Sequence, residues 1–255
     1  PKECEIMTNK IDNVDRALHG IARGAGIFFA GTIISMFFGF LSRALIARYF
    51  SVAEYGVFNL SLTVLSISLV IATLGFQNSL PREIAFYRER DPLKVRDLIP
   101  TALIIVGFSS LIWTIILVFS AWKVALIFND ERLISALRLI AFSLPFSALI
   151  VTVVAVSRGF GRVREQVYFQ SLFYPLSFLV LVSINVVLKL PFDYIFLAYI
   201  IAQAVTLFAL IFDSWRTKPF ELRISLNLSL GKDLIRFSFP LMLSGILAFL
   251  MGWTD

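Results

Sequence analysis

Six long hydrophobic runs follow one another along this chain, and they constrain its fold more than any other feature of the sequence. Each has the ~20 residues that a helix needs to cross ~30 Å of hydrocarbon. None alternates in the manner of the ~10-residue strands of a membrane β-barrel. The sequence therefore predicts an all-α integral membrane protein with six complete transmembrane helices and the start of a seventh. The runs are Gly26–Ala47, Gly56–Gln77, Leu98–Trp122, Ala136–Ser157, Val167–Leu188 and Tyr194–Phe212, and the seventh begins near Phe237.

The composition excludes most classes of soluble protein. Of 255 residues, 58% are hydrophobic and 16% are charged, whereas soluble domains carry about 25% charged residues. One cysteine, Cys4, and one histidine, His19, leave no disulfide framework, zinc cluster or histidine-based catalytic triad. No glycine-rich phosphate loop occurs in a strand–helix context. We expect no cofactor, no metal and no enzymatic activity, and we attribute the net charge of +6 to topology rather than to nucleic-acid binding.

Basic residues are unequally distributed between the two sets of connecting segments. Seventeen of the 23 lysines and arginines lie before the first run or in the segments after the second, fourth and sixth runs, and six lie on the opposite side. Cytoplasmic loops of membrane proteins are rich in Lys and Arg. The pattern therefore predicts a multi-pass cell-membrane protein with its N-terminus in the cytoplasm.

The polar segments divide the chain into four predicted parts. Within the first part, residues from Ile11 to Ile21 show the spacing of a short helix that lies on the inner leaflet. The last hydrophobic run is too short to complete a span, so we expect a piece of a longer protein. The parts are a cytoplasmic or interfacial segment 1–25, a six-helix lobe 26–213, a cytoplasmic linker 214–236 and the truncated start of a second lobe 237–255.

Prolines predict interruptions at three places. Asp91-Pro92 should divide the loop between spans two and three into two helical pieces. Pro145 and Pro175 lie inside spans four and five, and both helices should kink there. Such kinks either shape a cavity or reflect the general frequency of proline in membrane helices.

Arginine, rather than an acidic residue, is the charged residue at membrane depth in the six complete runs. Arg43 lies 17 residues into span one and Arg48 follows near its outer end. Both side chains can snorkel to outer head groups. Alternatively, Arg43 faces the bundle interior or water, where its planar guanidinium suits phosphate oxygens.

Span two carries a polar stripe on one helical face, which begins at Asn59 and ends at Gln77. In lipid, such a face must meet another helix or line a water-filled cavity, and both interpretations remain open. Just before this stripe, Ser51 and Glu54 have the spacing of a capping box, so Glu54 is expected to cap the helix rather than to bind a ligand. The members of the stripe are Asn59, Thr63, Ser66, Thr73 and Gln77.

Several segments resemble one membrane-protein family. Arg43–Asn59 is similar to the end of span one and the start of span two in polysaccharide-biosynthesis membrane proteins, the O-antigen flippases, which are related to lipid II flippases and MATE exporters. Leu80-Pro-Arg82-Glu-Ile-Ala and Ser157-Arg-Gly-Phe-Gly-Arg162 also match. Phe239 to Asp255 resembles the opening of that family's second six-helix half. The resemblance implies two lobes around a cavity that opens alternately to either face of the membrane. It also implies that the substrates are polyprenyl-phosphate- or pyrophosphate-linked oligosaccharides.

A lipid-linked phosphate needs fixed cations along its path, because bare transfer of its charge into hydrocarbon costs many kcal/mol. We expect the polar face of span two to form a wettable wall between an inner and an outer group of cations. Asp255 is the first acidic residue at membrane depth. The candidate substrate-binding residues are Arg82, Arg158 and Arg162 at the inner mouth, Arg43 and Arg48 toward the outer end, Asn59, Thr63 and Gln77 between them, and Asp255.

Three other functions compete with flipping of a lipid-linked oligosaccharide. A MATE-like exporter of cations is disfavoured because the complete spans contain no acidic residue. A membrane glycosyltransferase or ligase should show a large external loop with carboxylates, whereas the external loops are short. A non-transporting scaffold is the third alternative. The expected partners are the lipid-linked oligosaccharide, membrane lipids, and a missing second lobe or another membrane subunit.

Overall fold

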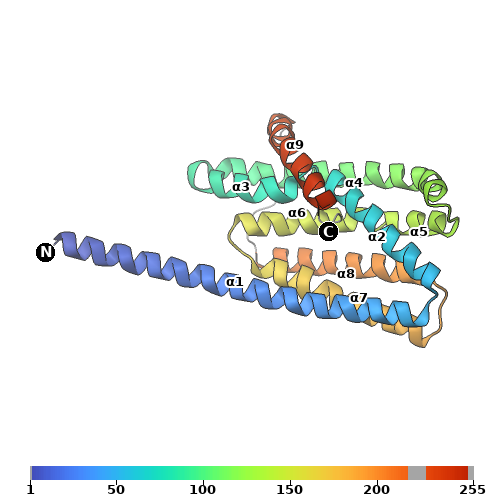
Figure 1. Ribbon diagram of the computed structural model, residues 1–255. Coiled ribbons are helices and arrows are strands. Elements are labelled where there is room, and N and C mark those ends of the chain that lie inside the picture. The colour runs from blue at the N-terminus through green and yellow to red at the C-terminus, as the bar shows by residue number, and fades with distance from the viewer. Residues whose placement is uncertain (1, 218–227, 252–255) are drawn as a thin grey trace.

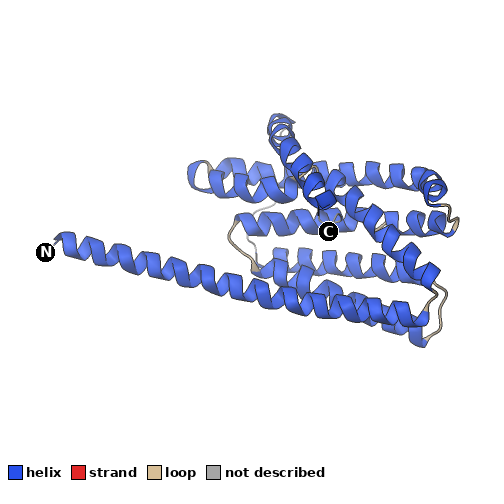
Figure 2. Cartoon of the chain, in the orientation of Figure 1, coloured by secondary structure: helices blue, strands red, loops and turns tan. Residues whose placement is uncertain are grey.

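The computed structural model describes the backbone of residues 2–217 and 228–251, and the side chains of residues 24–216, 230–232, 234–247 and 251. Within these residues every regular element is a helix (Figure 2), as predicted. Helices distant in the sequence run beside one another and alternate in direction (Figure 1). The elements are α1 (Lys2–Tyr49), α2 (Val52–Ala72), α3 (Phe76–Arg90), α4 (Pro92–Phe128), α5 (Arg132–Ala141), α6 (Leu144–Gly159), the π-helix η1 (Gln166–Phe173), α7 (Tyr174–Val187), α8 (Asp193–Thr217) and α9 (Leu228–Met251).

Six segments in the described part of the chain are long and apolar enough to span a membrane. Five are formed by α1, by α2 with α3, by α4, by η1 with α7, and by α8, and α5 with α6 forms the sixth as a bent pair. The six predicted spans are confirmed. The predicted interruption at Asp91-Pro92 is also confirmed, because α3 ends at Arg90 and α4 begins at Pro92.

Helix α1 runs without a break over 48 residues. The short interfacial helix predicted over Ile11–Ile21 is therefore not a separate element but the first part of α1, and this part projects beyond the bundle (Figure 1). Its position on the inner leaflet stays a prediction. Farther along, α1 packs on η1 at Gly31, where a Cβ atom would lie 2.5 Å from a methyl carbon of Val167. Helix α1 makes few contacts with α2.

Pro145 and Pro81 each release a backbone carbonyl inside a span, and a side chain of a neighbouring helix binds it. Because proline has no N–H, the carbonyl four residues earlier loses its helical partner. Pro145 releases the carbonyl of Ala141 in this way, and the Thr114 hydroxyl of α4 donates to it at 3.3 Å. Helices α5 and α6 meet here at 43°, which confirms the kink predicted at Pro145. At Pro175, η1 gives way to α7, so span five is also irregular at its proline.

Pro81 releases the carbonyl of Gln77 within α3, and an arginine of α6 binds it. Arg158 Nη2 donates to this oxygen at 2.8 Å. The next residue, Gly159, lets the two helices approach closely, because a Cβ atom there would lie 2.7 Å from Ile84 Cβ. Arg158 therefore completes the broken hydrogen-bond ladder of α3.

Span two is broken between α2 and α3, and α9 packs on this break. Leu74 and Gly75 have φ angles of +52° and +75°, a left-handed conformation that favours glycine. A Cβ atom on Gly75 would lie 2.9 Å from both the Ser238 carbonyl oxygen and the Met242 nitrogen. One turn along α3, the buried hydroxyls of Ser79 and Ser238 lie 2.6 Å apart. The start of the seventh run is thus packed directly on the first six spans.

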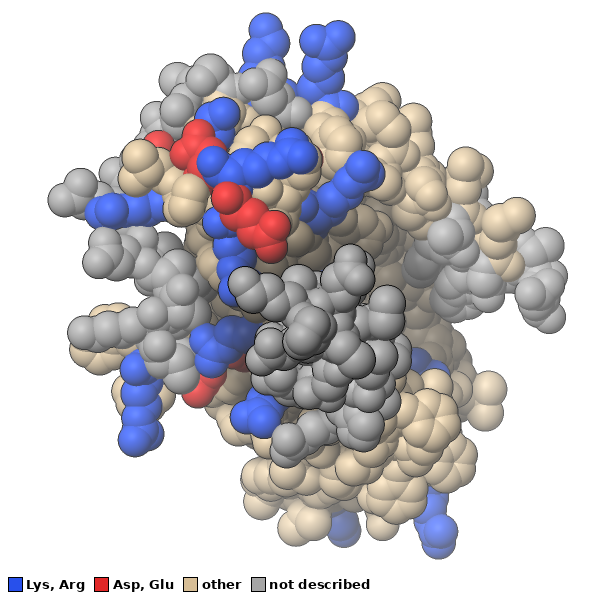
Figure 3. Space-filling view, turned by 90° about the vertical axis from the view of Figure 1, so that its left-hand side faces the viewer, with Lys and Arg blue, Asp and Glu red and all other residues tan. Residues whose placement is uncertain are grey.

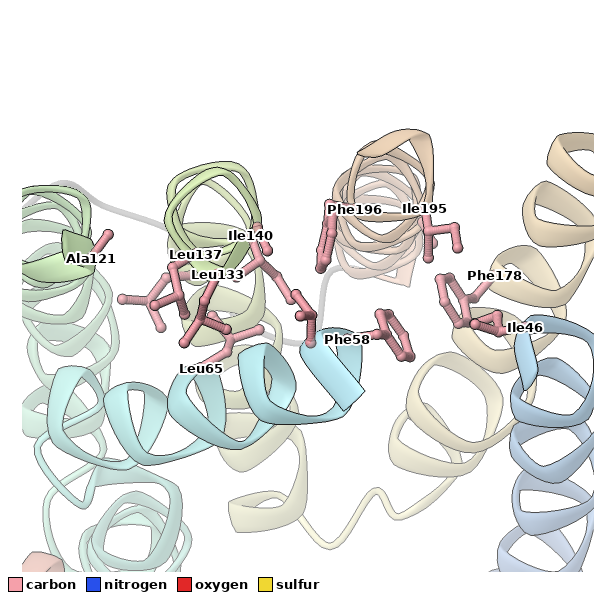
Figure 4. Close-up of a cluster of buried hydrophobic side chains, with 14 of the residues drawn as sticks. Ile46, Phe58, Leu65, Ala121, Leu133, Leu137, Ile140, Phe178, Ile195 and Phe196 are labelled. Carbon is pink, nitrogen blue, oxygen red and sulfur yellow. The ribbon is translucent and has the colours of Figure 1, made fainter. Parts of the chain in front are cut away.

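A cluster of buried apolar side chains joins α2 to α5, α7 and α8. Phe58 of α2 lies between the rings of Phe178 and Phe196, at centroid distances of 6.3 and 6.0 Å (Figure 4). Leu65 of the same helix packs with Leu137 of α5. In a bilayer, close packing of this kind is a main source of helix association, because lipid tails are as apolar as the side chains.

The capping box predicted at the start of α2 is present. Ser51 Oγ accepts a hydrogen bond from the Glu54 N–H at 3.2 Å, and the Ser51 N–H donates to Glu54 Oε2 at 2.8 Å. Glu54 is therefore a helix cap, as expected. The box fixes the sharp reversal between α1 and α2.

Cysteines at positions 79 and 238 should form a disulfide bond readily, because the two serine hydroxyls are 2.6 Å apart. The test uses full-length protein in which Cys4 is serine, oxidised and examined for linked peptides by mass spectrometry. Near-complete linkage is expected for Ser79→Cys with Ser238→Cys. The control pairs Asn78→Cys with Ser238→Cys, since Asn78 is exposed. Equal linkage in both pairs, or none in the first, contradicts the packing of α9 on α3.

Arg158→Leu should destabilise the fold more than Arg164→Leu, because only Arg158 binds a carbonyl that Pro81 has released. The expected loss in unfolding free energy is about 1–3 kcal/mol, the cost of an unpaired buried polar group. Arg164 is exposed and provides the matched control. The measurement is thermal unfolding of the two purified variants in the same detergent. Indistinguishable curves would show that Arg158 has no such structural role.

Candidate functional site

A cleft of about 420 Å³ opens between α1, α2, α7 and α8. Helix α1 contributes small, polar and apolar residues to its lining, and the other three helices contribute mainly aromatic rings. No carboxylate occurs among the described residues that line it. The lining residues that carry polar groups or rings include Ser35, Ser42, Arg43, Phe58, Tyr174, Phe178 and Tyr199.

Arg43 supplies the only charged side chain among these lining residues. It lies six residues before the end of α1 at Tyr49, about 9 Å along the helix axis at ~1.5 Å per residue. The guanidinium makes no hydrogen bond or ion pair with another described residue, and the nearby Tyr174 hydroxyl interacts with it electrostatically. The structure thus places Arg43 at the cleft with its hydrogen-bonding capacity available to a ligand.

The polar stripe of span two bonds mainly to its own helix. The Asn59 amide donates to the Tyr55 carbonyl at 2.9 Å, and the Thr63 hydroxyl donates to the Asn59 carbonyl at 3.0 Å. Ser66 and Thr73 follow the same pattern. These bonds do not reach another helix, so they do not supply the interhelical bonding that was one interpretation of the stripe. Asn59 and Thr63 follow Phe58 and Leu62, which line the cleft, but are not themselves among the lining residues.

Tyr174, Tyr199 and Gln203 are polar residues of the site region that the sequence analysis did not single out. The rings of Tyr174 and Tyr199 meet edge to face with centroids 5.9 Å apart. Gln203 Nε2 donates to the Tyr199 hydroxyl oxygen at 3.3 Å. A signal was available: Tyr199 and Gln203 lie four residues apart well inside span six, where an amide must find a polar partner.

At the inner mouth, the predicted cations make contacts within the protein. Arg162 Nε pairs with Glu165 Oε1 at 2.8 Å, and this glutamate is buried. Arg158 binds the backbone carbonyl of Gln77. This contact is with the main chain of Gln77 and not with the side chain that belongs to the predicted polar stripe. Both arginines thus make a contact within the protein, and their predicted part in substrate binding stays a prediction. The sequence analysis did not identify Glu165.

The remaining candidates lie apart from the cleft. The exposed Arg82 stacks on Phe237 of α9, with its guanidinium carbon 5.5 Å from the ring centroid. Arg48 is exposed in the last turn of α1. Asp255 lies outside the described residues. The predicted set is therefore not one constellation: Arg43 lines the cleft, and Arg82 lies at the α3–α9 contact.

Lys and Arg side chains are spread over the end of the molecule from which α1 projects, with few Asp or Glu among them (Figure 3). Exposed members include Arg88, Arg90 and Lys94 around the α3–α4 turn, and Arg164 between α6 and η1. Basic charge is typical of the cytoplasmic end of a membrane protein. Among the described residues no group of three or more His, Cys, Asp or Glu is placed to hold a metal ion.

Solved structures with the same fold are transporters. A MATE protein crystallised with MaD5 superposes with a TM-score of 0.73 at 18% identity, over 89% of this chain and 54% of that chain. The Vibrio cholerae MATE transporter VcmN gives 0.71 at 17% identity, over 92% and 57%. A MOP superfamily transporter from Pyrococcus furiosus gives 0.71 at 16% identity, over 89% and 52%. The chain thus spans about half the length of the solved structures it matches.

Comparison with protein families identifies the chain more narrowly than the fold does. No curated protein matches the sequence significantly. The family model described as polysaccharide biosynthesis protein matches residues 21–255, which include all six spans and the cleft. This chain therefore belongs to the polysaccharide biosynthesis protein family.

Proposed function

We propose that this chain forms the first lobe of a transporter that moves a polyprenyl-phosphate- or pyrophosphate-linked oligosaccharide to the outer face of the cell membrane. Family membership supports the substrate class, and the fold shared with MATE and MOP transporters supports alternating access between two lobes. The chain spans about half of those transporters. A second lobe, on the same chain or on another subunit, provides the other wall of the central cavity.

The observation that carries this proposal is Arg43, which has no hydrogen bond or ion pair with another described residue and lines a cleft whose described lining contains no carboxylate. A phosphate that leaves water for a low-dielectric medium must be compensated by fixed cations. The guanidinium supplies a planar pair of charge-assisted hydrogen bonds to phosphate oxygens. Arg82 acts at the inner mouth and Arg48 at the outer end of this path. Arg158 binds the first turn of α3, and Arg162 pairs with Glu165 just before η1.

The same observation weighs against a MATE-like exporter of cations. A cationic cargo requires negative charge or acceptor groups where it is desolvated. The described lining of the cleft offers a guanidinium instead. The cleft therefore favours an anionic cargo.

The basic end of the bundle faces the cytoplasm in this proposal. The α3–α4 turn and the connection between α6 and η1, which carry exposed basic residues, lie at this end, from which α1 projects (Figures 1 and 3). The positive-inside rule supports a cytoplasmic N-terminus. The lipid-linked substrate enters from this side and leaves toward the α1–α2 turn.

Replacement of Arg43 in the full-length protein should lower export of the lipid-linked oligosaccharide. Arg43→Ala removes charge-assisted hydrogen bonds worth about 1.5–3 kcal/mol, so a loss of about tenfold or more is expected. Arg43→Lys keeps the charge without the paired geometry and should cause a smaller loss. Export is measured in a flippase-deficient strain at matched membrane expression.

Arg138→Ala and Arg138→Lys are the matched controls, because Arg138 is exposed on α5 and does not line the cleft. They should retain most of the export rate. If Arg43→Ala exports at the wild-type rate, Arg43 has no part in substrate transport. If Arg43→Lys is fully active while Arg43→Ala is not, Arg43 supplies charge without bidentate binding.

Single cysteines should report the orientation of the bundle. In a Cys4→Ser background, Arg88→Cys should react only with thiol reagents that enter the cytoplasm, because Arg88 is exposed at the basic end. Glu131→Cys, exposed at the α4–α5 turn, should react with impermeant external reagents on intact cells. External labelling of position 88 contradicts the orientation.

A further inference from the structure

The part of the cleft lining that α2, α7 and α8 contribute is mainly aromatic, and its rings pack on one another in defined geometries. Tyr174 stacks on Phe178 with centroids 6.3 Å apart and planes 14° apart. Tyr199 meets Phe178 edge to face at 5.7 Å. Phe178 is held in turn by Phe58. Packed rings of this kind hold the two tyrosine side chains in fixed positions, so that the wall is preorganised for a ligand.

The hydroxyl of Tyr199 is also oriented. Its oxygen accepts a hydrogen bond from Gln203 Nε2 at 3.3 Å, and its ring meets the Tyr174 ring edge to face. A phenol carries one donor and two acceptor positions. Because the amide can only donate through this nitrogen, the Tyr199 O–H is left to act as a donor. The wall thus combines flat apolar rings with a directed hydroxyl donor.

This chemistry does not suit the hydrocarbon part of the substrate. An isoprenoid chain in the cleft would leave the Arg43 guanidinium without a hydrogen-bond partner and the Tyr199 O–H donor unused, and unpaired polar groups in an apolar environment are costly. A sugar ring has apolar C–H faces that pack on aromatic rings and hydroxyls that pair with tyrosine and arginine. The volume of about 420 Å³ lies in the ~300–1,000 Å³ range of small-ligand sites, enough for part of an oligosaccharide.

We infer that this cleft binds the sugar next to the phosphate of the lipid-linked oligosaccharide, with Tyr174 and Tyr199 contacting the ring and Arg43 the phosphate. The inference rests on the proposed function and adds which part of the substrate the cleft recognises. Tyr199 recognises a sugar hydroxyl, and Gln203 is a positioning residue that holds the phenol. The cleft therefore distinguishes a sugar-bearing lipid from the bare lipid carrier.

The test compares two ligands and three variants of the full-length protein in nanodiscs. The ligands are polyprenyl pyrophosphate and polyprenyl pyrophosphate carrying one hexose, and their dissociation constants are measured by native mass spectrometry. Tyr199→Phe keeps the ring and removes the hydroxyl. It should weaken binding of the hexose-bearing lipid by about fivefold to tenfold, the effect of one lost hydrogen bond, and leave the bare lipid unchanged. Arg43→Ala should weaken binding of both lipids.

Tyr194→Phe is the matched control, because Tyr194 is exposed near the start of α8 and does not line the cleft. It should bind both lipids as the wild type does. An equal effect of Tyr199→Phe on both lipids, or none on either, overturns the sugar site and leaves the proposed function in place. A wild-type protein that binds neither lipid overturns the proposed function and, with it, this inference.

Discussion

A backbone carbonyl without a partner is costly in hydrocarbon, and the arrangement of this bundle depends on how such carbonyls are satisfied. Pro81 and Pro145 each release one carbonyl, and each is bound by a side chain from a neighbouring helix, Arg158 or Thr114. These bonds join α3 to α6 and α5 to α4 at the positions where the helices are irregular. These bonds stabilise the irregular helices at their breaks. Helix α9 packs on the break in span two.

Polar side chains of the bundle differ in whether they have a partner within the protein. The stripe of span two binds its own backbone, Arg162 binds Glu165, and Arg158 binds a released carbonyl. Arg43 has no such partner and lines a cleft with two tyrosines. Intramembrane arginines commonly mark substrate or ion pathways, and we propose that Arg43 binds the phosphate of a lipid-linked substrate.

Features set by local chemistry were predictable from the sequence, and features set by helix neighbours were not. Hydropathy located the six spans, and the rules for serine and proline located the cap at Ser51 and the kink at Pro145. Helical periodicity placed the stripe of span two on one face, but it could not show that the hydroxyls fold back onto their own helix. The partners of Arg158 and Arg162, and the contact between Tyr199 and Gln203, depend on packing and loop geometry that periodicity does not encode.

The central claim is that the lipid-linked oligosaccharide enters the cleft between α1, α2, α7 and α8. Site-specific photo-crosslinking in living cells tests it most directly, with a benzophenone amino acid at Leu62, which lines the cleft, or at Ile67, which is exposed on the same helix. The cleft position should capture the oligosaccharide-bearing lipid, identified by mass spectrometry, and position 67 should not. Capture at Ile67 alone, or at neither position in an actively exporting strain, would contradict the claim.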